Sequence, residues 1–210
     1  VIHKYFPKSK NSKATPFGNG HINDTYKLAV SNMPQDFILQ RINTDVFKNP
    51  QGIIDTHLKL QKLIRKHSDS LTIAELIPNT NGSFLTIDQR GNAWRVTSFI
   101  NDSYTINVVE EDWQAFEAGF GYGWFAKVCS ELNASDFKEA INDFHRLSFR
   151  VKQLNEAIQI NKAGRLESVK DIVNFYKERE AKLSKIESLV DDGLIPLRIV
   201  HNDTKINNLL

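Results

Sequence analysis

Short β-prone runs separated by polar turns occupy the first part of the chain, a pattern typical of β-strands joined by hairpin turns. Runs at residues 22–30 and 37–42 flank the polar turn 31–35, and this arrangement predicts a hairpin. Further runs at 83–87 and 93–100 flank another polar turn and predict a second strand pair. Together these runs predict an antiparallel sheet near the N-terminus.

One helix is predicted between the two strand pairs. Asn49-Pro50 is a helix-start signal, because Pro is tolerated at the first helical position. Apolar residues then recur near helical spacing at Ile53, Ile54, Leu58, Leu63 and Ile64. The Lys-rich start of the chain, by contrast, is expected to be a solvated lead-in.

Helical spacing of apolar residues replaces the β-prone runs after residue 104. Trp113, Phe116 and Phe120 predict a helix, in which Gly119 and Gly123 would let a second helix approach closely. A longer apolar face predicts one amphipathic helix, with positions Phe137, Ile141, Phe144, Leu147, Val151, Leu154 and Ile158. Another helix is predicted over residues 167–189, ending at Asp191-Asp192-Gly193.

The last residues predict a short strand at 196–200, a polar loop, and a second strand beginning at Leu209 and Leu210. The whole order predicts the α+β class. A β-rich N-terminal lobe with one helix is expected over residues 1–102, and a partial, mainly helical lobe over 103–210.

Composition narrows the class of protein only a little. With 40% hydrophobic and 25% charged residues, the chain is an ordinary globular one, and a net charge of +2 argues against a nucleic-acid partner. Cys129 has no second cysteine to pair with, which suits a reducing compartment. No apolar run approaches the roughly 18 residues that cross a bilayer. A cytoplasmic protein without a membrane partner is the expectation; the oligomeric state stays open.

The polar loop HNDTKINN at residues 201–208 carries the strongest chemical signal. Asp203 and Asn208 stand five positions apart, the spacing of a kinase catalytic loop, where an Asp orients the acceptor hydroxyl and an Asn binds magnesium. Lys205 would bring positive charge to the transferred phosphoryl group. His201 is placed to pack beneath the loop. Two lobes in this order, with a cleft between them, are typical of protein-kinase-like enzymes. An Asn- and Asp-rich turn between two strands is the plainer alternative.

Two other segments stand where a nucleotide site would need them. The turn at 17–26 contains Gly18, Asn19 and Gly20, and it is either a phosphate-covering turn or an ordinary hairpin turn. At the expected lobe boundary, the backbone of Ser98, Phe99 and Ile100 is a candidate for pairing with an adenine edge, the alternative being a plain strand end.

Several motifs together resemble the aminoglycoside phosphotransferase superfamily, and within it the N-acetylhexosamine 1-kinase branch. They run in order over nearly the whole chain: GNGHINDTYKL, FILQRINTDVFKNP, WRVTSFI, the F-E-A-G-x-x-x-G-x-F run from Phe116 to Phe125, INDFHRLSFR and IVHNDTKINNLL. HNDTKINN is shared across the superfamily, whereas GNGHINDTY together with LQRIN is more specific to the branch.

The resemblance implies an ATP- and magnesium-dependent kinase that phosphorylates the anomeric hydroxyl of N-acetylglucosamine or N-acetylgalactosamine. It implies that Asp203 takes or orients the proton of that hydroxyl and that Asn208 binds magnesium. His21 and Asn23 of the glycine turn would contact the sugar, although a satisfied turn histidine is nearly as good an interpretation for His21.

The chain departs from the family pattern in two places. The third strand normally carries a Lys or Arg that reaches the ATP phosphates, but here Gln40 follows Leu39 and the positive charge comes only at Arg41. Strand alternation puts these two on opposite faces, and Gln40 is expected to face the cleft. The family also continues into an acidic motif that supplies the main magnesium ligand, so the chain resembles a truncated one. We expect this piece alone to be inactive, and either poorly stable or dimeric.

Rival functions remain at this point. The acceptor is an amino sugar in the first hypothesis, and an aminoglycoside, choline or another sugar in the second. A nucleotide-binding pseudokinase is a third hypothesis, to which the unusual Gln40 is a pointer. A purely structural role is disfavoured by the ordered set of motifs.

Overall fold

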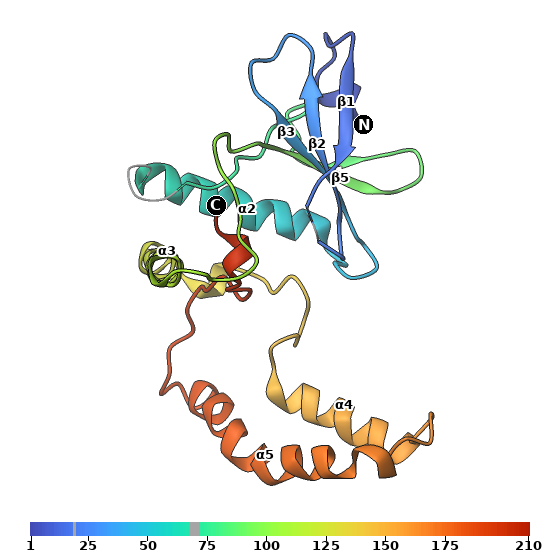
Figure 1. The fold of residues 1–210 in the computed structure, drawn as a ribbon, viewed down its shortest axis with the longest axis vertical. Coiled ribbons are helices and arrows are strands. Elements are labelled where there is room, and N and C mark those ends of the chain that lie inside the picture. The colour runs from blue at the N-terminus through green and yellow to red at the C-terminus, as the bar shows by residue number, and fades with distance from the viewer. Residues whose placement is uncertain (19, 68–71) are drawn as a thin grey trace. The chain divides into compact units, whose positions relative to one another are not determined.

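A computed structural model describes residues 1–18, 20–67 and 72–210, so Asn19 of the glycine turn lies outside the described residues. By its internal contacts the chain divides into two compact units, residues 1–140 with 198–210, and residues 141–197 (Figure 1). The lobe boundary expected between 102 and 103 lies inside the first unit and stays a prediction.

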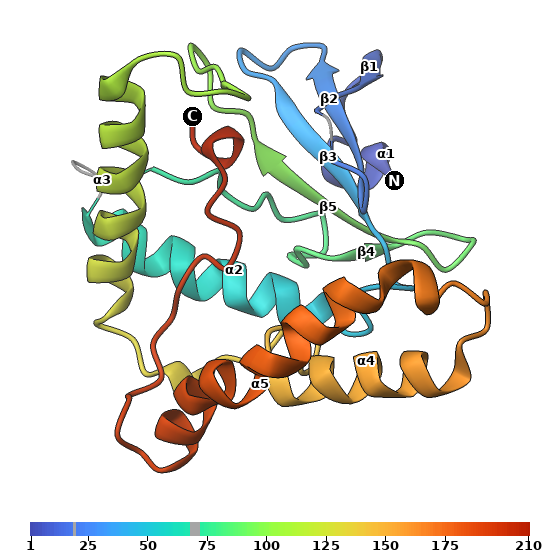
Figure 2. The same cartoon turned by 60° about the horizontal axis from the view of Figure 1, so that its bottom comes forward.

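The first unit contains a five-stranded antiparallel sheet with the order β1-β2-β3-β5-β4 (Figure 2). Its strands are β1 (Ser12–Pro16), β2 (Asp24–Val30), β3 (Phe37–Ile42), β4 (Thr86–Ile87) and β5 (Ala93–Ser98). The two predicted hairpins are both present, as β2 with β3 and as β4 with β5. The antiparallel N-terminal sheet and the α+β class are therefore confirmed.

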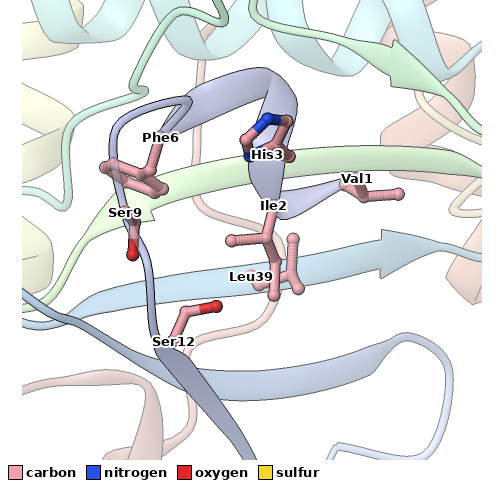
Figure 3. Close-up of a pocket in the computed structure, with 7 residues that line it drawn as sticks. All are labelled: Val1, Ile2, His3, Phe6, Ser9, Ser12 and Leu39. Carbon is pink, nitrogen blue, oxygen red and sulfur yellow. The ribbon is translucent and has the colours of Figure 1, made fainter.

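Alternation along the strands gives the sheet two different faces. Leu28, Leu39 and Val96 point to one face, where they pack with Tyr5 of the short helix α1 (Ile2–Tyr5). A cavity of about 370 Å³ lies on this side between the N-terminal segment and Leu39 (Figure 3). Its lining is mostly apolar and includes none of the predicted site residues.

The opposite face of the sheet carries the helix α2 (Pro50–Ile64). Ile42 and Ala93 of the sheet pack there with Ile54 of the helix. The Asn49 side chain accepts a hydrogen bond from the Gly52 backbone N–H at 3.0 Å, which satisfies one free donor of the first turn. A Cβ at position 52 would lie 2.7 Å from the Asn49 amide nitrogen, so Gly52 leaves room for this cap. The predicted helix is confirmed, and the short 3₁₀ turn η1 (Arg65–His67) follows it.

The lysines of the N-terminal segment are exposed as expected, but the segment is more than a lead-in, because it forms part of the fold. Residues 2–5 form α1, and β1 pairs with β2, Ser12 standing opposite Val30. All five residues of β1 are exposed, which explains why the edge strand shows no apolar alternation in the sequence.

The helix α3 (Asp112–Cys129) is present as predicted, but it is buried only at its C-terminal end. A capping box between Glu111 and Gln114 starts it. Val128 and Cys129 pack against the end of α2, and burial raises the pKa of the Cys129 thiol to about 11. Nearer its start the aromatic side chains are exposed. A Cβ at Gly119 or Gly123 would meet no described atom within 4 Å, so no described helix approaches there.

The prediction of one long helix from residue 137 to 158 is wrong. The short 3₁₀ turn η2 (Ala134–Asp136) is followed by non-helical chain, and Asp143 has a left-handed backbone with φ of 54°. The helix α4 (Leu147–Ile160) starts only after this turn. Its first turn is capped from elsewhere, because the Glu187 carboxylate accepts the Ser148 backbone N–H at 2.8 Å. The apolar period continues through a segment whose backbone cannot be helical.

The second unit is a helical hairpin of α4 and α5 (Lys170–Asp191), with the short turn η3 (Glu167–Val169) before α5 (Figure 2). The helix predicted over 167–189 is thus confirmed. Hydrogen bonds from Ser148 and Arg146 hold the pKa of Glu187 at about 2. Neither helix buries a side chain completely, and a groove of about 330 Å³ runs between them.

The two strands predicted around the polar loop are not formed. Residues 196–200 and 209–210 make no ladder of backbone hydrogen bonds with any described segment, and a β-strand requires such pairing. Ile199 instead packs with the cluster of Leu63, Val128 and Cys129, which ties the entry of the loop to α2 and α3. Within the described part of the chain, no helix is both long and apolar enough to cross a membrane.

Replacing Ile54 by Ala tests the interface between α2 and the sheet. Its side chain is 1% exposed, so the variant is expected to lower the free energy of unfolding by about 2–5 kcal/mol, because it leaves a cavity. Ile87→Ala removes the same atoms from a side chain that is 50% exposed and is expected to cost well under this amount. Urea denaturation of both variants measures the difference; equal losses would contradict this packing.

Candidate active site

The HNDTKINN loop gathers its three chemical groups within one short turn. Residues 206–208 form the 3₁₀ turn η4 (Ile206–Asn208), which brings Asn208 back toward Asp203. The Asn208 amide Nδ2 donates to the Asp203 carboxylate at 2.9 Å and to the Asp203 backbone carbonyl at 2.8 Å. The Lys205 Nζ lies 3.2 Å from the same carboxylate. The spacing of five residues therefore produces a cluster of carboxylate, amide and ammonium.

Electrostatics keep the central carboxylate of this cluster ionised. The hydrogen bond from Asn208 is the largest cause that lowers the pKa of Asp203, and the hydrogen bond and charge of Lys205 add to it. The nearby charge of Asp203 contributes to raising the pKa of the Tyr122 hydroxyl, although burial is the larger cause.

Aromatic residues of α3 hold the loop in place. The His201 ring lies 5.3 Å from the Tyr122 ring and 5.9 Å from the Phe125 ring, measured between centroids. The Tyr122 hydroxyl donates to the Lys205 carbonyl at 2.7 Å. Tyr122 is not among the site residues predicted from the sequence; its three-residue spacing from Phe125 on one helix is the signal that points to it.

In the glycine turn, the structure gives the predicted residues different surroundings. Gly18 has φ of 79°, a conformation that favours glycine, and a Cβ at this position would meet no described atom within 4 Å. The same holds for the described surroundings of Gly20. His21 is exposed, and no side-chain hydrogen bond is made by its ring within the described chain.

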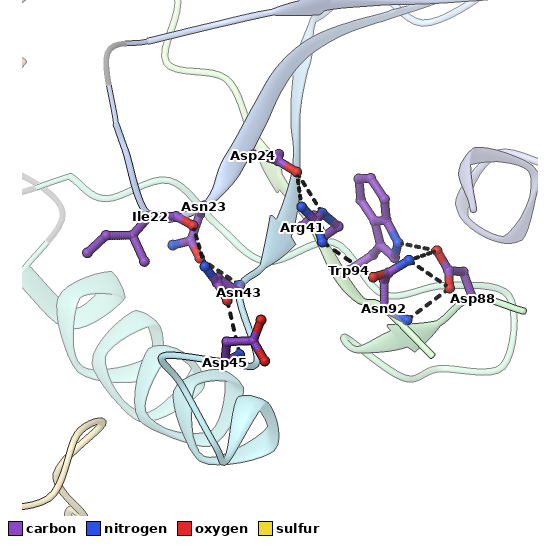
Figure 4. A network of polar contacts seen from close by, with 9 residues as sticks. All are labelled: Ile22, Asn23, Asp24, Arg41, Asn43, Asp45, Asp88, Asn92 and Trp94. Carbon is purple, nitrogen blue, oxygen red and sulfur yellow. Dashed lines mark hydrogen bonds and ion pairs between the residues drawn. The ribbon is translucent and has the colours of Figure 1, made fainter. Parts of the chain in front are cut away.

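Asn23 is used to connect two loops. Its Oδ1 accepts the Asn43 backbone N–H at 2.9 Å, and the Asn43 amide donates to the Ile22 carbonyl at 3.1 Å (Figure 4). The motifs HIND and QRIN are thus joined by two hydrogen bonds, both donated by Asn43, which gives their joint occurrence a physical reason. These bonds hold the turn between β1 and β2 against the end of β3.

Gln40 and Arg41 lie on opposite faces of β3. Arg41 shares a face with Leu39; its Nε donates to Asp24 at 2.6 Å, and its Nη1 lies 3.4 Å from the Asn92 side-chain oxygen (Figure 4). Gln40 faces α2, where its amide donates to the Thr25 hydroxyl at 2.9 Å. Arg41 is therefore engaged in holding β2 and the β4–β5 turn, whereas Gln40 is on the face that carries the helix.

At the end of β5, part of the backbone proposed for adenine pairing is already occupied. The Ser98 N–H donates to the Glu75 carbonyl at 2.8 Å, and the Phe99 N–H donates to the Asp36 carbonyl at 3.2 Å. The Ile100 carbonyl accepts from the Ser103 hydroxyl at 2.6 Å. Backbone pairing with a base is consequently more restricted than the sequence predicts.

The same strand end carries an aromatic pair that the sequence analysis missed. The Phe17 and Phe99 rings meet edge to face, with centroids 5.6 Å apart. The Lys27 Nζ lies 4.0 Å from the centroid of the Phe99 ring. The glycine turn and the strand end are therefore neighbours, and they offer an exposed ring and a cation. Among the described residues, no hydrogen bond or ion pair joins this group to the HNDTKINN loop.

The donor set of the loop suits a magnesium ion in part. Asn208 uses its amide nitrogen toward Asp203, and its Oδ1 accepts no hydrogen bond from any described residue. Carboxylate and amide oxygens are the ligands that Mg²⁺ prefers, with substrate phosphates and water completing the shell. Groups of three or more His, Cys, Asp or Glu side chains placed to hold a metal do not occur in the described ranges.

No protein-family model matches the chain. Among solved structures, the chain is similar to spectinomycin phosphotransferase APH(9)-Ia, crystallised with ADP and spectinomycin. The match has a TM-score of 0.47 and 11% identity, and it covers 96% of this chain and 60% of that chain. The chain thus spans less than two thirds of that protein's length.

Removing the Asn208 amide is expected to raise the pKa of Asp203. The folded-state pKa lies below the ordinary value of 3.8, so the ionised carboxylate contributes stability at neutral pH, and this contribution is lost as the pH falls through the folded-state pKa. In Asn208→Ala and in Lys205→Met the pKa of Asp203 is expected to move toward the ordinary value, because each variant removes a group that lowers it. A pH titration of the carboxyl carbon by NMR measures both; an unchanged pKa of Asp203 in Asn208→Ala would contradict this account.

Proposed function

We propose that the full-length protein is an ATP- and magnesium-dependent phosphotransferase with a small-molecule alcohol as acceptor, of the aminoglycoside phosphotransferase type. The observation that carries the proposal is the cluster formed by Asp203, Lys205 and Asn208 in the H-x-D-x-K-x-x-N spacing. Phosphoryl transfer is catalysed mainly by positioning and charge, and this turn supplies a carboxylate, a cation and a metal-binding oxygen together.

Asp203 orients the acceptor in this proposal. Its carboxylate accepts the hydrogen bond of the acceptor hydroxyl, whose oxygen forms a bond to the γ-phosphorus as the bond to the bridging oxygen of ADP breaks. The proton passes to Asp203. Because the pKa of Asp203 is lowered, the carboxylate is a weak base that orients the hydroxyl early and takes the proton late.

Lys205 and Asn208 would stabilise the negative charge of the transferred phosphoryl group. The Lys205 ammonium is exposed and lies beside the carboxylate, where it can stabilise the oxygens of the phosphoryl group. Asn208 Oδ1 would hold magnesium, which when bound neutralises charge on the nucleotide phosphates. The amide nitrogen of Asn208 meanwhile keeps the Asp203 carboxylate in one orientation.

The nucleotide would contact the end of the sheet that carries the glycine turn. Gly18 and Gly20 leave space for phosphates, and the Phe17 and Phe99 rings offer an apolar surface for the base. Ser98, Phe99 and Ile100 provide the backbone groups that remain beside the base.

For the acceptor, we propose the anomeric hydroxyl of an N-acetylhexosamine. Support comes from the resemblance of GNGHINDTY and LQRIN to the N-acetylhexosamine 1-kinase branch. The bonds between Asn23 and Asn43 join these two motifs and leave the His21 ring exposed, available to a sugar hydroxyl. Asn23 would then act mainly by holding this turn.

Asp203→Asn in the full-length protein tests the kinase chemistry. The amide keeps the size of the side chain but neither accepts the proton nor carries charge, so kcat is expected to fall by about 10²–10⁴-fold while ATP binding is retained. Asp192→Asn, at the exposed end of α5, is the matched control and should leave kcat unchanged. A wild-type protein that binds ATP without turnover in the presence of magnesium would instead indicate a pseudokinase.

The acceptor is tested by ATP consumption with a panel of alcohols. N-acetylglucosamine and N-acetylgalactosamine are expected to give the highest kcat/KM, above aminoglycosides, choline and other sugars. The methyl glycoside of N-acetylglucosamine is the control, because its anomeric oxygen is blocked, and it should not be phosphorylated. Its turnover, or a preference for another alcohol, would overturn the acceptor and leave the phosphotransferase chemistry intact.

A further inference from the structure

Arg95 is a partly buried cation beside Gln40 that the proposed mechanism has not used. It stands on β5 directly opposite Gln40 of β3 in the strand register, on the face that carries α2. Its Nε and Nη2 donate to the Gln40 Oε1 at 3.0 and 2.8 Å. The positive charge missing from position 40 is therefore present on the neighbouring strand, at the same level of the sheet.

The partners of Arg95 are oriented by bonds of their own. The Gln40 amide nitrogen donates a hydrogen bond to the Thr25 hydroxyl. This bond orients the Gln40 side-chain oxygen toward the Arg95 guanidinium. The His57 Nε2 lies 2.8 Å from the Ala74 carbonyl, and because this nitrogen must donate, Nδ1 is left as an acceptor 3.4 Å from Arg95 Nη1. Burial and the charge of Arg95 lower the pKa of His57, so the ring is neutral at pH 7.

The guanidinium is thereby positioned but not neutralised. Gln40 and His57 are both uncharged, and within the described ranges no carboxylate forms an ion pair with Arg95. Of its five N–H groups, the hydrogen bonds above occupy three. A partly buried cation without a counter-charge is costly unless an anion binds it, and the planar fork matches phosphate oxygens.

Two other cations of the sheet, Arg41 and Lys27, already have acidic partners, and Lys13 is exposed on the edge strand β1. Arg41 is bound to Asp24 on the opposite face, and Lys27 lies 3.0 Å from Asp36. Arg90 is exposed in the turn before β5. Among these, only Arg95 combines a fixed orientation, the α2 face and the lack of an acidic partner in the described chain.

We propose that Arg95 binds the phosphate oxygens of the nucleotide, and that Gln40 is a positioning residue that holds its guanidinium. This inference rests on the proposed function, because the anion is taken to be a nucleoside di- or triphosphate. It assigns the phosphate contact to β5 instead of β3. It also explains why position 40 carries an uncharged side chain, because an acidic residue there would neutralise the Arg95 cation and a basic one would repel it.

The test compares ADP with adenosine as ligands of the full-length protein by isothermal titration calorimetry. Arg95→Met should weaken the affinity for ADP at least about tenfold and leave the affinity for adenosine unchanged, because only ADP carries phosphates. Arg95→Lys should recover part of the loss. Arg90→Met is the matched control and should bind both ligands as the wild type does. If Arg95 had a purely structural role, its replacement would change the affinities for ADP and adenosine alike.

Gln40→Glu keeps the test valid if Arg95→Met fails to fold. The carboxylate keeps the shape of the side chain, accepts from the Thr25 hydroxyl and pairs with Arg95, so the fold should be retained while ADP binding weakens selectively. Unchanged ADP affinity in Gln40→Glu and in any folded Arg95→Met overturns the inference and leaves the proposed function standing. A wild-type protein that binds no ADP overturns both.

Discussion

The pairing of β3 with β5 decides where each polar group of the sheet points. Antiparallel register puts Gln40 opposite Arg95, and alternation sends both to the face of α2, together with Ile42 and Ala93. A shift of one residue would exchange this face with the apolar one that packs on α1. The apolar cores on the two faces therefore fix the register, and the register fixes the charge beneath the helix.

The geometry of the HNDTKINN loop is largely local, unlike that of the sheet. Asp203 and Asn208 lie within one turn of chain, and their contact requires only that the 3₁₀ turn forms. Its anchoring is not local: Tyr122 and Phe125 of α3 hold the backbone and the His201 ring. A spacing motif thus specifies the cluster, and a helix far away in sequence specifies where the cluster is held.

Sequence patterns succeeded where one physical signal dominated. The helix α2 has a cap, a proline at its first position and an apolar face, and all of these agree. Sequence patterns failed where apolar periodicity and backbone hydrogen bonding favoured different structures. From residue 137 the apolar period continues, but the left-handed Asp143 and the cap that Glu187 gives to Ser148 delay the helix to Leu147. Periodicity describes side chains, whereas a helix start is decided by backbone hydrogen bonds.

The sequence by itself determined the α+β class, the two hairpins, the helix after Asn49, and the grouping of Asp203 with Asn208, because each depends on residues close together in the chain. Only the tertiary structure decided that β1 forms the sheet edge, that Arg41 is held by Asp24, and that Arg95 stands beside Gln40. Pairing between distant segments chooses partners by packing and register, and no local spacing records that choice.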